Sequence, residues 1–342
     1  MQPKIESLEE LTAQIEACLR ADNGSANQDQ FAGILRAVLK LAADNAERGD
    51  LKILSRAMQE LRHAFRIFAP YRGVRKVSIF GSTRVAESDP YYRLARDLAA
   101  GLARANFMVI TGAGPGIMQA GHEGAGRDKS FGVNIRLPSI QDANPFIRDD
   151  PKLMNFHFFF TRKLIFVKEA DAVVVFPGGF GTQDELYESI TLVQTGKSRV
   201  VPIVLMDLPA GTYWSRWQEF LRDDMMSRGY IDDFEMNLVN IVTSAQEAVS
   251  VITTFYRNYH SYRFVNEDLI IRLNQAPKTE LVDWLNRDFA DIVTGGAVRP
   301  TDPLPEEADE PETLPLHRLR MRFNRTDFAR LRRMIDVINA AV

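Results

Sequence analysis

The order of apolar segments between Lys76 and Tyr259 constrains the fold of this chain more than any other feature. Short runs of apolar and β-branched residues alternate there with longer segments whose apolar residues recur at helical spacing. The predicted strands span 77–80, 107–111, 131–137, 172–176, 200–206 and 238–242, and the predicted helices span 90–105, 158–170, 181–194, 214–226 and 244–259, with one more helix around Ile117 and Met118. Because continuously apolar strands separated by helices are typical of sheets buried on both faces, the pattern predicts an α/β fold with a doubly wound parallel sheet.

The segments on either side of this region have different patterns. Residues 1–70 contain no strand-like run, and three stretches with helical spacing (Leu8 to Leu19, Phe31 to Leu41, Leu51 to Phe65) predict a helical extension. Residues 71–260 would then form a nucleotide-binding core, and residues 261–342 a small C-terminal α/β appendage.

Two features of the appendage stand out in the sequence, a proline-rich acidic segment and a series of alternating arginines. Residues 299–315 carry five prolines among acidic residues, which predicts an exposed linker. Arg318, Arg320 and Arg322 alternate with apolar residues. RNA binding would use such arginines, but a solvated strand face explains the period of two better.

Composition limits which partners and which cellular compartment we expect for this protein. The 342 residues include 42 basic and 45 acidic side chains, so the net charge of −3 favours neither nucleic acid nor an anionic membrane. No apolar run reaches the roughly 18 residues that a membrane span needs. The single cysteine, Cys18, cannot form an internal disulfide, and the first residues lack a signal-peptide core. We therefore expect a cytoplasmic protein without nucleic-acid or membrane partners.

No metal site or cofactor is predicted. The five histidines do not pair at the spacing of metal ligands; they are His63, His122, His157, His260 and His317.

The segment that follows the predicted strand 172–176 carries the main chemical signal. It reads Pro177-Gly178-Gly179-Phe180-Gly181-Thr182-Gln183-Asp184-Glu185 and leads into a helix. Glycines between a buried strand and a helix start expose backbone N–H groups at the positive end of the helix dipole, which suits a phosphate group. The alternative is a glycine-rich turn that serves only close strand–helix packing.

Two charged residues could add catalysis to such a phosphate site. Glu185 stands three residues after Thr182, so the pair also matches a capping box in which the glutamate only caps its helix. Arg162 and Lys163 lie between apolar triplets, which fits either cations in a cleft or surface cations whose stems cover apolar residues. The residues alone leave both alternatives open.

Further glycines follow the first two predicted strands. Gly81 and Ser82 end the first, and Gly112, Gly114 and Gly116 follow the second. A dinucleotide fingerprint would need an acidic residue about 20 positions later, at the end of the second strand, and none is there. NAD is therefore disfavoured, and a mononucleotide fits better, with these glycines and Ser82 lining its base and ribose.

Taken in order, these motifs resemble a known family. Thr161-Arg162-Lys163, Ala170-Asp171-Ala172 and the segment from Pro177 to Glu185 are similar to the RK and PGGxGTxxE motifs of LOG (LONELY GUY) proteins. Asn144-Pro145, Phe158-Phe159 and Leu192 to Gly196 resemble the longer bacterial subtype. The resemblance covers about residues 73–260.

The resemblance implies a Rossmann-like core that forms homodimers or higher homo-oligomers, each site borrowing residues from a partner subunit. It implies that Arg162 and Glu185 are catalytic and that Gly178, Gly179, Gly181 and Thr182 bind phosphate. It further places Lys163, Asp184 and Thr191 on the substrate side. Asp184 departs from the family, where many members have glutamate, and this leaves the natural substrate open.

The implied reaction is hydrolysis of the N-glycosidic bond of a nucleoside 5′-monophosphate, of the AMP or cytokinin riboside type, to free base and ribose 5-phosphate. Two alternatives compete with it. One is a non-catalytic nucleotide-binding or carrier protein of the same fold. The other is a pyridoxal-phosphate decarboxylase, for which the sequence identifies no Schiff-base lysine.

Overall fold

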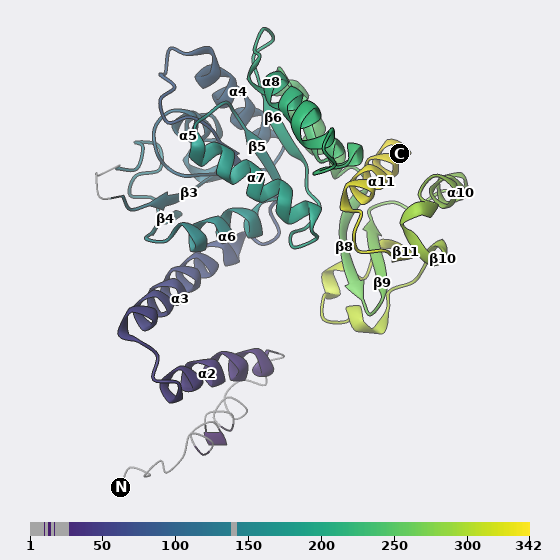
Figure 1. Cartoon of the computed structure of the whole chain (residues 1–342), viewed down its shortest axis with the longest axis horizontal. Helices are drawn as coiled ribbons and strands as arrows, with labels where there is room; N and C mark the ends of the chain where they lie inside the picture. The colour runs from purple at the N-terminus through teal and green to yellow at the C-terminus, as the bar shows by residue number, and fades with distance from the viewer. Residues whose placement is uncertain (1–9, 11–12, 15–16, 18–26, 138–141) are drawn as a thin grey trace. The chain divides into compact units, whose positions relative to one another are not determined.

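The computed structural model describes residues 10, 13–14, 17, 27–137 and 142–342 (Figure 1). Its internal contacts define two compact units, residues 1–62 and 63–342. The first unit contains α2 (Gln28–Ala43) and most of α3 (Arg48–Phe68), which confirms a helical N-terminal region. Leu8, Leu11, Ile15 and Leu19 of the first predicted helix lie outside the described residues, as does Cys18. The predicted domain boundaries at residues 70 and 260 stay predictions.

A seven-stranded parallel sheet forms the centre of the second unit, and it confirms the predicted fold class. The strands are β1 (Lys76–Phe80), β2 (Met108–Thr111), β3 (Ser130–Ile135), β4 (Leu153–Phe156), β5 (Ala172–Val175), β6 (Ile203–Met206) and β7 (Val239–Val242), in the order β4-β3-β2-β1-β5-β6-β7. Strand β4 was not predicted. Its four residues include the exposed Asn155, so it lacks the continuous apolar run of the other strands.

Helices cover both faces of this sheet (Figure 1). Helices α4 (Pro90–Arg104), α5 (Ile117–Ala125) and α9 (Ala245–Phe255) share one apolar cluster with Val77 and Ile79 of β1. The alternate side chain Phe80 instead packs against Phe166 of α6 on the opposite face. The bounds of the remaining helices of the core are α6 (Phe159–Glu169), α7 (Phe180–Gln194) and α8 (Tyr213–Phe220).

Two predicted helices are longer than the observed ones. The predicted helix 214–226 ends as α-helix at Phe220 and continues as a π-helical turn, Leu221–Met226. The predicted helix 244–259 ends at Phe255, because Tyr259 already belongs to the next strand. None of the helices in the described ranges is long and apolar enough to cross a membrane.

The order in which the chain adds strands to the sheet reverses at β1, and this determines where a ligand can bind. The chain runs outward from β1 through β2, β3 and β4, and then returns to place β5 on the other side of β1. The loops after β1 and β5 therefore lie side by side, and Ser82 N–H donates to the Pro177 carbonyl across 3.2 Å. Crevices at such switch points are where open α/β sheets bind their ligands.

The C-terminal part of the same unit forms a four-stranded antiparallel sheet of order β10-β11-β9-β8. Its elements are β8 (Tyr259–Val265), β9 (Asp268–Leu273), α10 (Thr279–Asp288), β10 (Val293–Pro300), β11 (His317–Phe323) and α11 (Phe328–Ala340). Alternating apolar residues in the sequence predict β9 and β11, and helical spacing over 279–289 and 328–338 predicts α10 and α11. Strands β8 and β10 were not predicted. Strand β10 contains Gly295 and Gly296, and its pairing with β11 shifts register twice.

A buried ion cluster corrects both structural interpretations of the appendage. Most of residues 299–315 are exposed, but the Glu307 side chain is fully buried and its carboxylate accepts from the Nε atoms of Arg272 (2.8 Å) and Arg318 (3.0 Å). The segment is therefore anchored to the sheet. The solvated-face interpretation is wrong for Arg318, which is 1% exposed, although Arg322 is exposed.

Candidate active site

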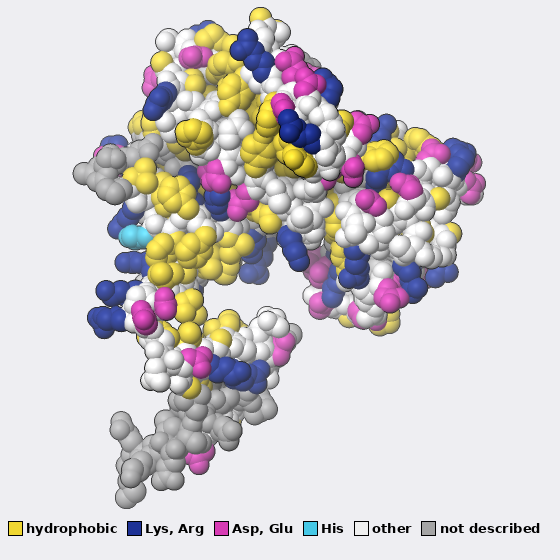
Figure 2. Space-filling view, in the orientation of Figure 1, with side chains coloured by type: hydrophobic (Ala, Val, Ile, Leu, Met, Phe, Trp, Pro, Cys, Tyr) yellow, Lys and Arg dark blue, Asp and Glu magenta, His cyan; other side chains and the backbone are white. Residues whose placement is uncertain are grey.

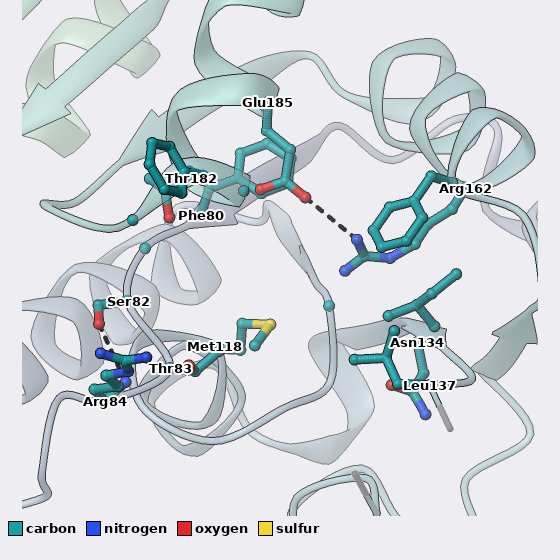
Figure 3. A pocket seen from close by; sticks show the side chains of 17 residues that line it. Phe80, Ser82, Thr83, Arg84, Met118, Asn134, Leu137, Arg162, Thr182 and Glu185 are labelled. Atoms are coloured by element: carbon teal, nitrogen blue, oxygen red, sulfur yellow. Dashed lines mark hydrogen bonds and ion pairs between the residues drawn. The ribbon is translucent and has the colours of Figure 1, made fainter. Parts of the chain in front are cut away.

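A cavity of about 600 Å³ opens at the carboxyl ends of β1 and β5 (Figure 3). The loops after β1, β2 and β5 line it together with residues from β3, α5, α6 and α7. The lining residues are Phe80, Gly81, Ser82, Thr83, Arg84, Gly112, Met118, Asn134, Ile135, Leu137, Phe159, Arg162, Gly179, Phe180, Gly181, Thr182 and Glu185. Eight residues that the sequence predicted as catalytic or substrate-binding thus meet in one cavity; they are Gly81, Ser82, Gly112, Arg162, Gly179, Gly181, Thr182 and Glu185.

Backbone amides dominate one end of this cavity. We call residues Pro177 to Thr182 the amide loop. Gly179 is the N-cap residue of α7, and the cap has no side-chain acceptor. The first N–H groups of a helix have no partner within the helix, and among the described residues those of positions 179 to 182 have no protein acceptor. The loop therefore presents free donors at the positive end of a 15-residue helix.

The predicted capping box is wrong. Helix α7 begins at Phe180, one residue earlier than predicted, so Thr182 lies inside the first turn instead of capping it. Glu185 consequently lies one turn further along and projects towards Arg162, as Figure 3 shows. Thr182 is buried against Gly178, where an added Cβ would lie 2.2 Å from the Thr182 hydroxyl oxygen.

Arg162 and Glu185 form an ion pair inside the cavity. Arg162 Nη1 lies 3.3 Å from Glu185 Oε1, and the two side chains are 8% and 15% exposed. Arg162 Nε donates to the Val133 carbonyl across 2.9 Å, which holds the guanidinium in place from β3. Gly112 leaves room for it, because an added Cβ would lie 2.3 Å from Arg162 Nη2.

Burial changes the proton affinity of this pair. Removal of the Glu185 carboxyl from water raises its pKa to about 7, although the positive charge of Arg162 opposes the rise. Burial also lowers the pKa of Arg162, and Glu185 opposes that shift. A carboxyl group that titrates near neutrality can exchange protons with a substrate or a water molecule at physiological pH.

A buried polar network supports the loop after β2 from behind. His122 is fully buried, lies 3.0 Å from Thr111 Oγ1, and contacts the side-chain amide of Asn144. Asn144 Nδ2 donates to the Gly114 carbonyl across 3.0 Å. Burial lowers the pKa of His122 to about 4, so the ring is neutral at physiological pH and serves as a hydrogen-bonding support.

Some predicted site residues do not line the cavity. Gly114 and Gly116 shape the loop after β2; Gly116 has a φ of 67°, and an added Cβ there would lie 2.4 Å from the Ser82 carbonyl oxygen. Lys163 Nζ instead binds Asp184 (2.7 Å) on the outside of α6 and α7. Thr191 is exposed on α7, and Gly178 belongs to the amide loop but does not line the cavity.

Other lining residues were missed by the sequence analysis. Asn134 stands at the carboxyl end of β3, the edge at which such sheets bind ligands, so its position was a usable signal. Met118 and Phe159 carried no such signal, because single apolar residues on helices are usually part of a core. Asn134 and Leu137 also line an adjoining hollow of about 490 Å³, together with Arg136, Arg148 and Asn155.

Comparison with known proteins shows which proteins this chain is similar to. The family model described as "Possible lysine decarboxylase" matches residues 116–252. The Escherichia coli K12 protein named pyrimidine/purine nucleotide 5′-monophosphate nucleosidase is 28% identical over 142 residues, covering 38% of this chain and 30% of that protein. The Arabidopsis thaliana cytokinin riboside 5′-monophosphate phosphoribohydrolase LOG3 is 25% identical over 186 residues, covering 53% and 83%.

These matches confirm, at low identity, the resemblance to the LOG family that the motifs indicated. The matched region spans under a third of the Escherichia coli relative. Solved structures with a similar chain path include the molybdenum cofactor carrier protein from Chlamydomonas reinhardtii, with 17% identity and a TM-score of 0.37 over 53% of this chain and 96% of that one.

Proposed function

We propose that this protein hydrolyses the N-glycosidic bond of nucleoside 5′-monophosphates, releasing the free base and ribose 5-phosphate. One observation carries the proposal: the Arg162–Glu185 pair and the donors of the amide loop face the same cavity. The names of the Escherichia coli and Arabidopsis relatives support the same reaction class.

The chemistry follows from these groups. Cleavage of an N-glycosidic bond develops positive charge on the sugar, as in glycoside hydrolysis. The ionised Glu185 carboxylate stabilises that charge and accepts a proton from the attacking water. Arg162 orients the substrate through hydrogen bonds to ribose hydroxyls or phosphate. Binding of the phosphate by the amide loop holds the sugar against Glu185, so binding energy remote from the bond contributes to the rate.

The leaving base would occupy the end of the cavity near Asn134 and Leu137. The adjoining hollow gives that end room for a substituent on the base, and its side chains are mainly polar, including Arg136 and Asn155. This lining suits an unmodified or polar base better than the apolar side chain of a cytokinin. We therefore propose AMP-type monophosphates as the preferred substrates.

The two rival functions make different demands on the site. A nucleotide carrier needs the amide loop but has no use for a buried carboxyl with a pKa near 7. A pyridoxal-phosphate decarboxylase needs a lysine for its Schiff base. No lysine is among the described residues that line the cavity, and Lys163 is engaged by Asp184 and Glu188.

The test is incubation of the purified protein with a panel of nucleosides, monophosphates and triphosphates, scored by release of free base. We expect cleavage of monophosphates alone, with AMP cleaved faster than its prenylated form. Binding of AMP without base release would favour the carrier function. Cleavage of nucleosides as fast as monophosphates would contradict the phosphate-binding role of the amide loop.

The exposed face of α6 supports the proposed homo-oligomer. Hydrophobic side chains gather over α6 in Figure 2, where Phe159, Phe160 and Leu164 are 53%, 56% and 47% exposed. Contiguous apolar surface of this kind is typical of protein interfaces. Light scattering coupled to gel filtration tests the proposal. Replacement of Phe160 and Leu164 by serine should lower the measured mass. A wild-type protein with the mass of a monomer would contradict the proposal.

A further inference from the structure

The orientation of one peptide group in the amide loop decides whether the loop can bind an anion. The carbonyl and the N–H of a trans peptide point in opposite directions, and the described chain has no cis peptide. The peptide between Gly178 and Gly179 therefore directs either its N–H or its carbonyl oxygen into the cavity. Only the first arrangement attracts a phosphate; the second repels it.

Glycines on both sides make this peptide easy to rotate. Neither residue has a Cβ, so the φ and ψ changes of a peptide flip meet little steric resistance. An added Cβ at Gly179 would meet no atom within 4 Å. The local chain therefore does not select the productive orientation by itself, and a contact from another element has to do so.

Tyr213 supplies that contact from the first residue of α8. Its hydroxyl donates to the Gly178 carbonyl oxygen across 2.6 Å and accepts from Gln183 Nε2 across 2.7 Å. The flanking carbonyls are occupied as well: Pro177 by the Ser82 N–H and Gly179 by the Gln183 N–H. With all three carbonyls engaged away from the ligand, the loop is left with N–H groups to offer.

A buried aspartate fixes Tyr213 in turn. Asp207 is 3% exposed and directly follows β6, and its Oδ2 accepts from the backbone N–H groups of Tyr213 (3.1 Å) and Trp214 (3.3 Å). The Tyr213 ring also packs edge-on against Trp214, with centroids 4.7 Å apart. Asp207 accepts a further hydrogen bond, 2.5 Å long, from the Tyr91 hydroxyl of α4.

We propose that Tyr213 is a positioning residue that holds the Gly178–Gly179 peptide with its N–H towards the cavity and thereby sets the affinity for the phosphate of the substrate. Tyr213 acts through the amide loop and lies outside the cavity lining. The inference rests on the proposed function for the identity of the ligand, a phosphate monoester of a sugar.

The experiment compares two tyrosine-to-phenylalanine variants by titration calorimetry. Tyr213→Phe removes the hydroxyl and keeps the ring. Tyr256→Phe is the matched control, because the Tyr256 hydroxyl also donates to a backbone carbonyl, that of Asp171, across 2.6 Å, near the amino end of β5. The probes are ribose 5-phosphate, which has the phosphate but no bond to cleave, and adenosine, which has no phosphate.

We expect Tyr213→Phe to weaken ribose 5-phosphate binding about three- to tenfold, the effect of one neutral hydrogen bond, with adenosine binding unchanged. Tyr256→Phe should bind both probes as the wild-type protein does. With AMP as substrate, Tyr213→Phe should raise KM more than it lowers kcat. Wild-type affinity of Tyr213→Phe for ribose 5-phosphate, or an equal loss for adenosine, would overturn the proposal.

A second variant tests the same contact in case Tyr213→Phe does not fold. Gln183→Leu removes the donor to the Tyr213 hydroxyl and leaves that hydroxyl in place, so a smaller loss of ribose 5-phosphate affinity is expected.

The binding measurement also separates this inference from the proposed reaction. If the wild-type protein binds ribose 5-phosphate but releases no base from AMP, hydrolysis fails and the role of Tyr213 is still decided by the titration. If wild-type protein does not bind ribose 5-phosphate, the positioning role is overturned as well.

Discussion

At the scale of single residues, the proposed chemistry depends on a carboxyl group that is buried beside a guanidinium. The Glu185 pKa of about 7 means that roughly half of the ligand-free molecules carry the charged form at neutral pH. Binding of a phosphate adds negative charge to the cavity, which raises this pKa further. Because the proposed base is the ionised form of Glu185, the fraction of active protein should increase with pH.

The increase of the ionised fraction of Glu185 with pH gives a prediction for the pH dependence of turnover. If ionised Glu185 is the base, kcat for AMP rises with pH through a value at or above about 7 and then levels off. Glu185→Gln should lower kcat on the order of 10²- to 10⁴-fold and remove this rise, while the titration of the substrate phosphate, with a pKa near 6, remains visible in KM. Stopped assays of base release between pH 5 and 9 measure both. A wild-type rate that falls as the pH rises through 7 would contradict the base role.

The sequence located the two residues of the buried ion pair but not their surroundings. Arg162 and Glu185 were found because they stand in ordered motifs, and their contact across 23 positions of sequence follows from parallel strands ending at one edge. The capping-box prediction failed because spacing alone does not tell whether Thr182 caps the helix or lies inside it. Asn134 was missed because the strand was predicted to run to Leu137, whereas β3 ends at Ile135 and so places Asn134 next to its carboxyl end.

At the scale of elements, the predicted starts of helices differed in accuracy: α4 begins at residue 90 as predicted, whereas α7 begins one residue earlier than predicted. Asp89 is the N-cap residue of α4, with Oδ1 accepting from the Tyr91 N–H across 2.8 Å, and Pro90 is the first helical residue. Strands without a continuous apolar run were harder to predict. Strands β4 and β10 exist because neighbouring strands pair with them, and pairing partners distant in sequence leave no local pattern.

The cap of α4 provides a stability prediction. Replacement of Asp89 by alanine removes the acceptor for the Tyr91 N–H and should lower the free energy of unfolding by about 1 kcal/mol. The neighbouring Ser88 is exposed and its side chain caps no helix, so Ser88→Ala should change it by less than about 0.5 kcal/mol. Urea titration followed by circular dichroism measures both variants. Equal losses in the two would show that the Asp89 side chain is not the cap.

The ion cluster of the appendage provides a second prediction at this scale. Burial alone would raise the pKa of Glu307, but the Leu304 N–H and the guanidinium groups of Arg272 and Arg318 lower it instead. Glu307→Gln leaves the buried Arg318 without a negative partner, while Arg272 keeps its ion pair with Glu310. The loss of the buried charge should cost about 3–5 kcal/mol. Glu306→Gln, at the exposed neighbouring position, is the control and should be nearly neutral. Thermal unfolding measures the difference, and similar midpoints for the two variants would contradict a stabilising role for the cluster.

At the scale of the whole unit 63–342, side chains of α11 join the appendage to the core. Asn339 is 1% exposed, and its Oδ1 accepts from the backbone N–H groups of Asn258 and Tyr259, both across 2.9 Å. Its Nδ2 donates to the carbonyl of Phe255, the last residue of α9, across 2.6 Å. One side chain thus satisfies three backbone groups where the chain leaves the core for β8. The sequence predicted α11 as a helix, but not this contact, because it joins positions about 80 residues apart.

This arrangement predicts that the core and the appendage unfold together. Asn339→Ala leaves buried backbone groups without partners, at about 1–3 kcal/mol each, and should lower the free energy of unfolding by about 3 kcal/mol while keeping a single transition. Asn237→Ala, which removes only an exposed hydrogen bond to the Phe234 carbonyl, is the control and should stay within about 0.5 kcal/mol of the wild-type protein. Urea unfolding followed in parallel by tryptophan fluorescence, where Trp214 reports on the core and Trp284 on the appendage, measures both the loss and the cooperativity. Two separate transitions in the wild-type protein would mean that α11 does not couple the two parts, and the effect of Asn339→Ala would then be confined to the appendage.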